Sequence, residues 1–274
     1  VYRSPRNLEL ARLYEAMMQE GLNELVYPIQ MAGLSYGLSI QKKGVILSIG
    51  GYSERMGDLI KLVTKNMKEV DVDEQKFANI KEAMIRGLNN KKFGQAYSRG
   101  GYYNGLMLLQ DQYTDEEKLS ALTALTLNDV KAFAKTLYDE VYITGMIYGN
   151  WSDTEAQKNV DILLSALGSK ALPENQRFEQ VVEVLPQGKT FQFSHEVEDN
   201  NNSLAYAIQI GEKSLSLLAQ SSIIASIVES DFYTQMRTNQ QLGYIVWSFN
   251  QRIEDRIFFR LVIQSSTHGP FAMS

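Results

Sequence analysis

The sequence contains no cysteine and only two histidines among its 274 residues. Without cysteine the chain can form neither a disulfide nor a thiolate metal site. A catalytic zinc needs three protein ligands and an open position, and a histidine–glutamate motif on one helix commonly supplies the ligands. His195 lies in a segment that we expect to be a strand, and His268 lies in the final stretch. We therefore predict no zinc site and no serine triad built from this chain's residues.

Long apolar runs and excess positive charge are also lacking. No stretch approaches the ~20 apolar residues that cross a bilayer, and no signal peptide opens the sequence. The 27 lysines and arginines are outnumbered by 32 acidic residues, which gives a net charge of −5. This balance disfavours a nucleic-acid partner, because phosphate binding depends on clustered basic residues.

The stretch 91–105, KKFGQAYSRGGYYNG, mixes basic residues, aromatics and glycines. Such a mixture is compatible with a nucleic-acid or phosphate surface. A phosphate loop, however, follows a strand and opens a helix, whereas helical sequence precedes this stretch. We interpret it as a turn whose tyrosines pack at a helix start.

Hydrophobic periodicity predicts helices mixed with paired strands. We expect a hairpin at 34–52, where alternating apolar runs flank a Lys-Lys-Gly turn, and a second hairpin at 242–266 that turns at Glu254 and Asp255. The other predicted strands are 141–150, 191–197 and 203–212, and the predicted helices are 7–33, 56–70, 73–90, 95–112, 126–140, 152–168 and 215–236.

Several helix ends carry capping signals. Asn7 suits the N-cap of the first predicted helix, and either Thr126 or Asn128 can cap the predicted helix at 126–140. Ser152 and Glu155 form a capping box at the start of 152–168, and Gly168 is a typical stop.

The periodicity fades between Ser169 and Thr190, where two prolines and many charges are typical of an interdomain linker. Paired strands with little βαβ alternation indicate the α+β class. We predict a nearly complete α+β unit at 1–168, a linker at 169–190 and the truncated start of a second α+β unit at 191–274. Both ends of the sequence suggest a fragment of a longer protein.

The segment SDFYTQMRTNQQLGYIVWSFNQ, residues 230–251, places Arg237 and Tyr244 on either side of a polar bend between a helix and a strand. The residues alone allow two interpretations. Arg237 could complement the dipole at a helix end while Tyr244 simply suits a strand. Alternatively, both could face one cleft, where a guanidinium and a phenol donate to a peptide carbonyl.

Two separated motifs resemble the pitrilysin/insulin-degrading-enzyme family of zinc metallopeptidases, the M16 or insulinase family. MRTNQQLGYIVWSF followed by FRLVIQSS is similar to the fourth domain of these proteins, and residues 21–67 are similar to the start of their third domain. The resemblance covers nearly the whole chain. It implies LuxS/MPP-like α+β units, four of which form two bowl-shaped halves around a peptide chamber.

The resemblance also implies roles for particular residues. The family's H-x-x-E-H zinc motif belongs to the first unit and has no match here, so zinc would be bound by the N-terminal half of a parent protein. Arg237 and Tyr244 would hold the substrate carbonyl and stabilise the tetrahedral transition state. Tyr233 would form the aromatic wall of the pocket for the residue after the cleaved bond, a role that Phe232 could fill instead.

The predicted function is therefore that of a noncatalytic C-terminal-half fragment of a zinc-dependent endopeptidase. Its partners would be peptide substrates and the N-terminal catalytic half of the same protein, and the chain alone would be inactive. One alternative is a segment of an inactive homologue that acts as a scaffold or processing-complex subunit, and another is a nucleic-acid binder that uses 91–105. The lack of cysteine favours a bacterial periplasmic parent over a cytoplasmic one.

Overall fold

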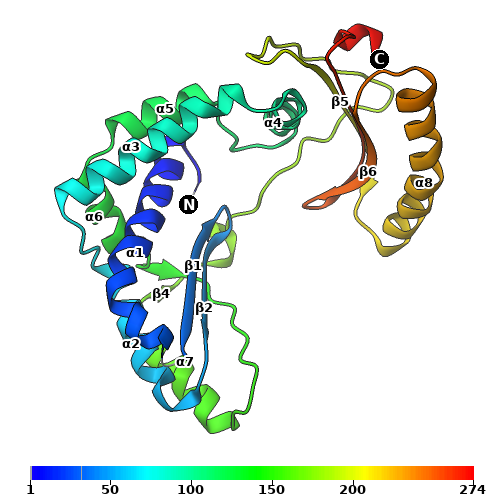
Figure 1. The fold of residues 1–274 in the computed structure, drawn as a ribbon. Coiled ribbons are helices and arrows are strands. Elements are labelled where there is room, and N and C mark those ends of the chain that lie inside the picture. The colour runs from blue at the N-terminus through cyan, green and yellow to red at the C-terminus, as the bar shows by residue number, and fades with distance from the viewer. Residues whose placement is uncertain (1, 32) are drawn as a thin grey trace. The chain divides into compact units, whose positions relative to one another are not determined.

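The computed structural model describes residues 2–31 and 33–274, with the side chains of 23–26 left aside. The chain forms two compact units (Figure 1). The first unit consists of Val1–Gly87 and Asp115–Glu179, and the second consists of Leu88–Thr114 and Gln180–Ser274. The predicted division at 169–190 is based on the loss of periodicity and the prolines and charges of that stretch, and it stays a prediction.

The first unit is mainly helical and carries one hairpin. Its helices are α1 (Pro5–Met31), α2 (Met56–Lys68), α3 (Glu74–Asn90, whose end lies in the second unit), α5 (Asp115–Ala124), α6 (Leu127–Thr136) and α7 (Asp153–Leu167). Its strands are β1 (Ser35–Gln41) and β2 (Gly44–Gly50), which form the hairpin, and the short parallel pair β3 (Glu140–Val141) and β4 (Lys170–Ala171). Helix α1 packs against α5, α6, α2 and β1, and α2 also packs against α7.

The core of the first unit is centred on Tyr14 of α1. Its ring is buried among apolar side chains and meets Phe133 edge-on. Its hydroxyl lies 2.6 Å from the Met67 carbonyl oxygen, to which it donates, and 2.9 Å from the Tyr138 hydroxyl. Because a buried polar group without a partner is costly, this chain of hydrogen bonds allows two phenols to lie inside the core.

The second unit is an antiparallel sheet with the order β5–β7–β6. These strands are β5 (Asn202–Glu212), β6 (Ile245–Ile253) and β7 (Arg256–Ser265). Helix α8 (Leu215–Tyr233), which continues into the π-helix η4 (Thr234–Asn239), packs on β6 and β7, and α4 (Ala96–Leu108) packs on β5 and β7.

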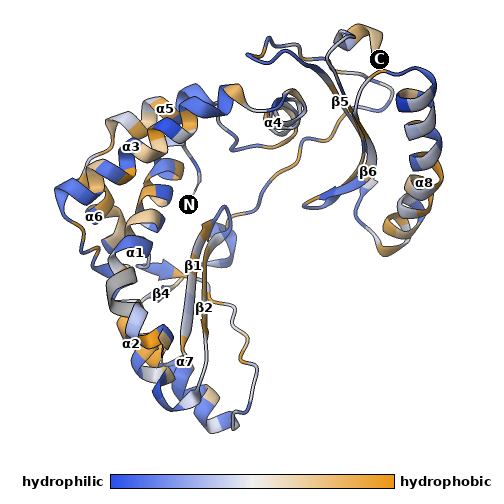
Figure 2. Ribbon diagram, viewed as in Figure 1, coloured by the Kyte–Doolittle hydropathy of each residue, from blue (hydrophilic) through white to orange (hydrophobic). Residues whose placement is uncertain are grey.

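The two helices of the second unit cover opposite faces of its sheet. Ile263 of β7 belongs to a core cluster that includes Phe232 of α8, whereas Phe258 of β7 packs with Leu108 of α4. Residues an odd number apart on one strand point to opposite faces. Several apolar side chains of α8 are nevertheless exposed: Leu215, Ile223, Ile224 and Ile227. Figure 2 colours the ribbon by hydropathy and marks hydrophobic positions along α8.

Many predicted elements are confirmed. Both hairpins form, with their turns at Lys42–Lys43 and Glu254–Asp255. Thr126 caps α6, and Ser152 and Glu155 make the capping box of α7. Gly168 ends α7 in the left-handed conformation at φ 58°. The remaining elements are short 3-10 turns: η1 (Ser53–Arg55), η2 (Lys91–Phe93), η3 (Glu174–Gln176) and η5 (Pro270–Ala272).

Some predictions at the residue level are wrong. Helix α1 begins at Pro5, and the Ser4 hydroxyl accepts from the Asn7 amide, so Ser4 rather than Asn7 caps it. Residues 142–148 and 191–197 form no strand, although all of them are described. A strand is stable only when a partner completes its ladder, and no described strand pairs with either run.

Two further differences concern helices. Helix α5 was not predicted. Helix α4 ends at Leu108 rather than near 112, because Leu109 bridges to Val182. That bridge also places part of the predicted linker against the second unit, where Val182 is buried.

The buried tyrosine pair makes the stability of the chain sensitive to alkaline pH. Burial raises the pKa of Tyr138 to about 12 and raises the pKa of Tyr14 above its usual value. Because the unfolded chain loses these protons near pH 10, the stability present below pH 10 falls as the pH rises towards 12. We expect Tyr138→Phe to reduce this loss of unfolding free energy, measured by urea titration at pH 8 and pH 11. The exposed Tyr148→Phe should leave it unchanged, and an equal loss in both variants would contradict the account.

Candidate functional site

The corner between α8 and β6 is held by backbone hydrogen bonds. The π-helix η4 ends when the Gln240 amide donates to the Gln235 carbonyl at 2.9 Å. The Leu242 amide then donates to the Met236 carbonyl at 2.9 Å. Gln241 between them takes a left-handed conformation with φ 54°. Short π-helices are rare and frequently occur at functional sites.

Two residues, Leu242 and Gly243, determine the path of the chain through this corner. Leu242 is only 5% exposed and packs in the cluster formed with Val246, Ile263 and Met273. Gly243 passes so close to β7 that an added Cβ would overlap the carbonyl oxygen of Gln264. Packing therefore requires leucine at position 242 and glycine at position 243, and these two residues determine the position of Tyr244.

Arg237 lies between two tyrosine rings. Its guanidinium carbon is 4.3 Å from the Tyr244 ring centroid and 5.0 Å from the Tyr233 ring centroid. Each contact has the geometry of a cation–π interaction, which contributes about 0.5–1 kcal/mol at exposed sites. Tyr244 is 80% exposed and Tyr233 41%, so the cluster is accessible to a ligand.

The guanidinium of Arg237 makes no salt bridge and no hydrogen bond with any described residue. A guanidinium has five N–H donors, and stacking on ring faces uses none of them. The cluster therefore presents hydrogen-bond donors from Arg237, and the exposed phenol of Tyr244 presents another. Carbonyl or carboxylate oxygens are the groups that such donors bind.

The structure brings together the three residues singled out from the sequence: Arg237, Tyr244 and Tyr233. It also separates Tyr233 from Phe232, the alternative for the aromatic wall. Phe232 packs against the buried cluster of Leu242, Val246 and their neighbours, so Tyr233 is the one that flanks Arg237. What these residues do in a reaction stays a prediction.

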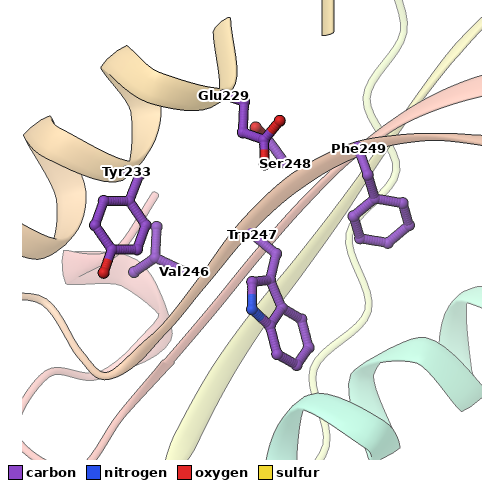
Figure 3. A pocket seen from close by; sticks show the side chains of 6 residues that line it. All are labelled: Glu229, Tyr233, Val246, Trp247, Ser248 and Phe249. Carbon is purple, nitrogen blue, oxygen red and sulfur yellow. The ribbon is translucent and has the colours of Figure 1, made fainter. Parts of the chain in front are cut away.

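A pocket of about 330 Å³ adjoins this cluster (Figure 3). Its lining residues come from α8 and β6: Glu229, Tyr233, Val246, Trp247, Ser248 and Phe249. Trp247 also packs edge-on against Tyr97 of α4, with ring centroids 5.0 Å apart. Apart from Tyr233, none of the lining residues was identified from the sequence. The available signal was the four-residue spacing of Glu229 and Tyr233, which places both on one helix face.

The zinc that the resemblance implies finds no matching ligand set among the described residues. His195 stacks against Phe193 and Tyr103. The Nδ1 of His268 lies 2.9 Å from the Thr267 hydroxyl. Neither histidine has described carboxylates or a second histidine placed as co-ligands, so the residues that the structure describes do not fit a zinc centre.

The stretch 91–105 consists of the turn η2 and the first part of α4. Arg99 stacks on Tyr102 and Tyr103, with its guanidinium carbon 4.4 and 5.3 Å from the ring centroids. Lys92 lies 3.4 Å from a carboxylate oxygen of Glu198. Two basic side chains of this stretch, Lys92 and Arg99, thus already contact other residues of the protein.

None of the helices in the described ranges has both the length and the apolar content to span a membrane.

Comparison with known proteins matches both parts of the chain. Residues 1–121 match the family model described as the middle or third domain of peptidase M16, and residues 124–270 match the model described as the peptidase M16 inactive domain. Insulin-degrading enzyme of Homo sapiens is 30% identical over 273 residues, which cover 96% of this chain and 26% of that protein. Insulin-degrading enzyme-like 1, peroxisomal, of Arabidopsis thaliana is 29% identical over 97% of this chain and 28% of its own length.

Solved structures show the same fold. The crystal structure of pitrilysin matches 97% of this chain and 28% of its own chain, with a TM-score of 0.80 and 21% identity. The peptidase M16 inactive domain from Pseudomonas fluorescens matches 92% of this chain and 63% of its own, with a TM-score of 0.63 and 18% identity. The chain thus spans about a quarter of the length of the curated relatives given above.

The close approach of Gly243 to β7 leads to a testable prediction about the stability of the chain. We expect Gly243→Ala to lower the free energy of unfolding by about 1–3 kcal/mol, since a methyl group there forces β7 and the corner apart. Gly269→Ala is the matched control, because an added Cβ at that position meets nothing within 4 Å; we expect a change within about 0.5 kcal/mol. Urea titration of the purified chain measures both. Equal stability of the two variants would show that the corner does not depend on this contact.

Proposed function

This chain belongs to the peptidase M16 family, and we propose that it serves a zinc-dependent endopeptidase by contacting the peptide substrate. It is homologous to the third and inactive domains of that family, which confirms the resemblance seen in residues 21–67 and 236–249. In this proposal the N-terminal half of the parent binds zinc and the substrate, and the present chain forms the opposing wall of an enclosed chamber.

The observation that carries the proposal is the position of Arg237 between Tyr233 and Tyr244. During peptide hydrolysis the carbonyl oxygen of the cleaved bond gains negative charge. The N–H groups of Arg237, which make no hydrogen bond to a described residue, and the O–H of Tyr244 are suitable donors for that oxygen. Because stacking already holds the guanidinium in place, little reorganisation is needed when the charge develops.

Tyr233 has a different role in the proposal. Its ring supports Arg237 on one side and borders the pocket on the other. The ring therefore positions the guanidinium and limits the side chains that fit beside the cleaved bond. A scaffold subunit without peptidase activity has no need for two exposed donors at one corner, so the cluster favours the peptidase over the inactive homologue.

The first test uses the full-length parent. We expect Arg237→Ala or Tyr244→Phe to lower kcat/KM for a peptide substrate by about 100–1000-fold, the effect of removing one transition-state donor. The loss should fall mainly on kcat, because the interaction strengthens only as the oxygen gains charge. Arg252→Ala, which removes another exposed arginine near the end of β6, is the matched control. If both variants fold and keep the wild-type kcat/KM, Arg237 and Tyr244 have only a structural role.

The second test uses the chain alone. Because its described residues do not fit a zinc centre, we expect the purified chain to contain far less than one equivalent of zinc and to cleave no peptide. Metal analysis and a fluorogenic peptide assay measure these quantities. Stoichiometric zinc together with turnover would disprove the assignment to the noncatalytic half.

A further inference from the structure

Gln264 of β7 is buried, and both polar atoms of its side-chain amide have partners. The side chain lies on the face of the sheet that α4 covers, like that of Phe258, an even number of residues away on the same strand. Its Oε1 accepts from the Tyr97 backbone amide at 2.9 Å, and its Nε2 donates to Oε1 of Gln95 at 3.0 Å. A buried polar group whose hydrogen bonds are all made is held rigidly. The side chain of Gln264 therefore has one fixed orientation.

The partners of Gln264 lie at the start of α4, where backbone amides have no acceptor inside the helix. The N-cap residue, Gln95, makes no capping hydrogen bond with its own side chain to a described amide. The sheet provides the contacts instead. Gln264 accepts from the amide of Tyr97, and the Ser203 hydroxyl of β5 donates to the Ala96 carbonyl at 2.7 Å. The first turn of α4 is thus tied to both β5 and β7.

The backbone of Gln264 supports the corner that leads into β6. Its carbonyl oxygen is the atom that a Cβ at Gly243 would overlap, and Gln264 is also the residue that pairs with Ile245 in the β6–β7 register. Tyr244 lies between these two contacts, so the same residue of β7 holds the chain on either side of it. The ring of Tyr244 then stacks on Arg237. A shift of the Gln264 backbone would therefore move Tyr244 relative to Arg237.

A ring contact joins α4 to β6 as well. The ring of Tyr97 meets the indole of Trp247 edge-on, with the centroids 5.0 Å apart. Tyr97 thus contacts β7 through its backbone amide and β6 through its ring. This gives the stretch 91–105, which stood out in the sequence, a place beneath the candidate site.

We propose that Gln264 is a positioning residue for Tyr244: its side chain, held by the first turn of α4, fixes the β7 backbone on which the corner before Tyr244 rests. The inference rests on the proposed function in giving Tyr244 a part in the reaction. It goes further in naming a buried residue of another strand that determines where the phenol lies. A misplacement of about 1 Å can lower the rate ~100-fold, so Gln264 affects the reaction without touching the substrate.

The first measurement is peptide hydrolysis by the full-length parent. Gln264→Met keeps the length of the side chain and removes both hydrogen bonds, so we expect kcat to fall about 10–100-fold. KM should stay within about 2-fold, because Tyr244 acts mainly in the transition state. Gln264→Asn shortens the amide so that it no longer reaches the Tyr97 amide, and it replaces the methionine variant if that one does not fold.

A conservative variant should restore the rate. Gln264→Glu keeps an acceptor for the Tyr97 amide, and a carboxylate is favoured at a helix N-terminus. The exposed amide of Gln95 can turn its NH2 group towards this carboxylate. We therefore expect Gln264→Glu to keep kcat within about 3-fold of the wild-type value, because both hydrogen bonds can form again.

Gln209 of β5 provides a matched control. It pairs with Phe258 in the β5–β7 register and so lies on the same face of the sheet as Gln264. Its Oε1 accepts from the Leu185 amide at 2.8 Å, and its Nε2 donates to the Glu183 carbonyl at 2.8 Å. Gln209→Met removes the same number of hydrogen bonds away from the corner. We expect an unchanged kcat, and urea titration compares the stability of the two methionine variants.

A second measurement reports on Tyr244 without catalysis. A meta-fluorotyrosine replaces Tyr244 in the purified chain, and fluorine NMR records its chemical shift. We expect Gln264→Met to move the resonance by more than its linewidth, whereas Gln264→Glu and Gln209→Met should leave it in place. In the full-length parent, adding Gln264→Met to Tyr244→Phe should lower kcat no further, because the group that Gln264 positions is already absent.

Four results overturn the inference: wild-type kcat in folded Gln264→Met, an equal loss of kcat in Gln209→Met, losses that multiply when Gln264→Met and Tyr244→Phe are combined, or an unshifted fluorine resonance in Gln264→Met. The proposed function fails separately. Wild-type kcat/KM in Tyr244→Phe refutes it, and the fluorine resonance then still decides whether Gln264 positions the ring. A loss in Tyr244→Phe without a loss in folded Gln264→Met refutes only the positioning role.

Discussion

The candidate site depends on one close backbone contact, the passage of Gly243 against the carbonyl of Gln264 in β7. This contact allows the chain to leave η4, bury Leu242 and enter β6 within a few residues. A side chain at position 243 would move β6 away from β7 and carry Tyr244 with it. The geometry of the exposed cluster is therefore determined by packing beneath it, which is how a rigid scaffold positions functional groups on a connecting segment.

The cluster combines fixed geometry with unused hydrogen-bonding capacity. Ring contacts on Arg237 restrict a side chain that otherwise has much rotamer freedom. Its N–H donors are not taken up by the described protein, and the neighbouring phenol is exposed. Tyr233 also borders a pocket that is lined by residues of α8 and β6. The two regions share one aromatic ring, that of Tyr233.

Much of this arrangement could be predicted from local patterns, and some could not. The hairpins and the capping box at Ser152 follow from short-range signals in the sequence, whereas the residues alone left open whether Arg237 and Tyr244 lie together, and only the family resemblance favoured it. Helix α5 has no clear apolar stripe, because one of its buried residues is Lys118, which lies 3.5 Å from Asp115. The choice between Tyr233 and Phe232 depends on the exact rotation of α8 where it becomes a π-helix. Residues 142–148 and 191–197 have strand propensity, but propensity does not supply a partner strand. The pocket joins residues from α8 and from both faces of β6, and only the tertiary packing of these two elements places them together.

The central claim is that Arg237 and Tyr244 act together on one developing negative charge. The most direct measurement is a crystal structure of the full-length parent with a phosphinic peptide, whose tetrahedral phosphorus group mimics the transition state. The account predicts that a guanidinium nitrogen of Arg237 and the hydroxyl of Tyr244 both lie about 2.7–3.1 Å from a phosphinate oxygen. A bound phosphinate with neither group within hydrogen-bonding distance would contradict it.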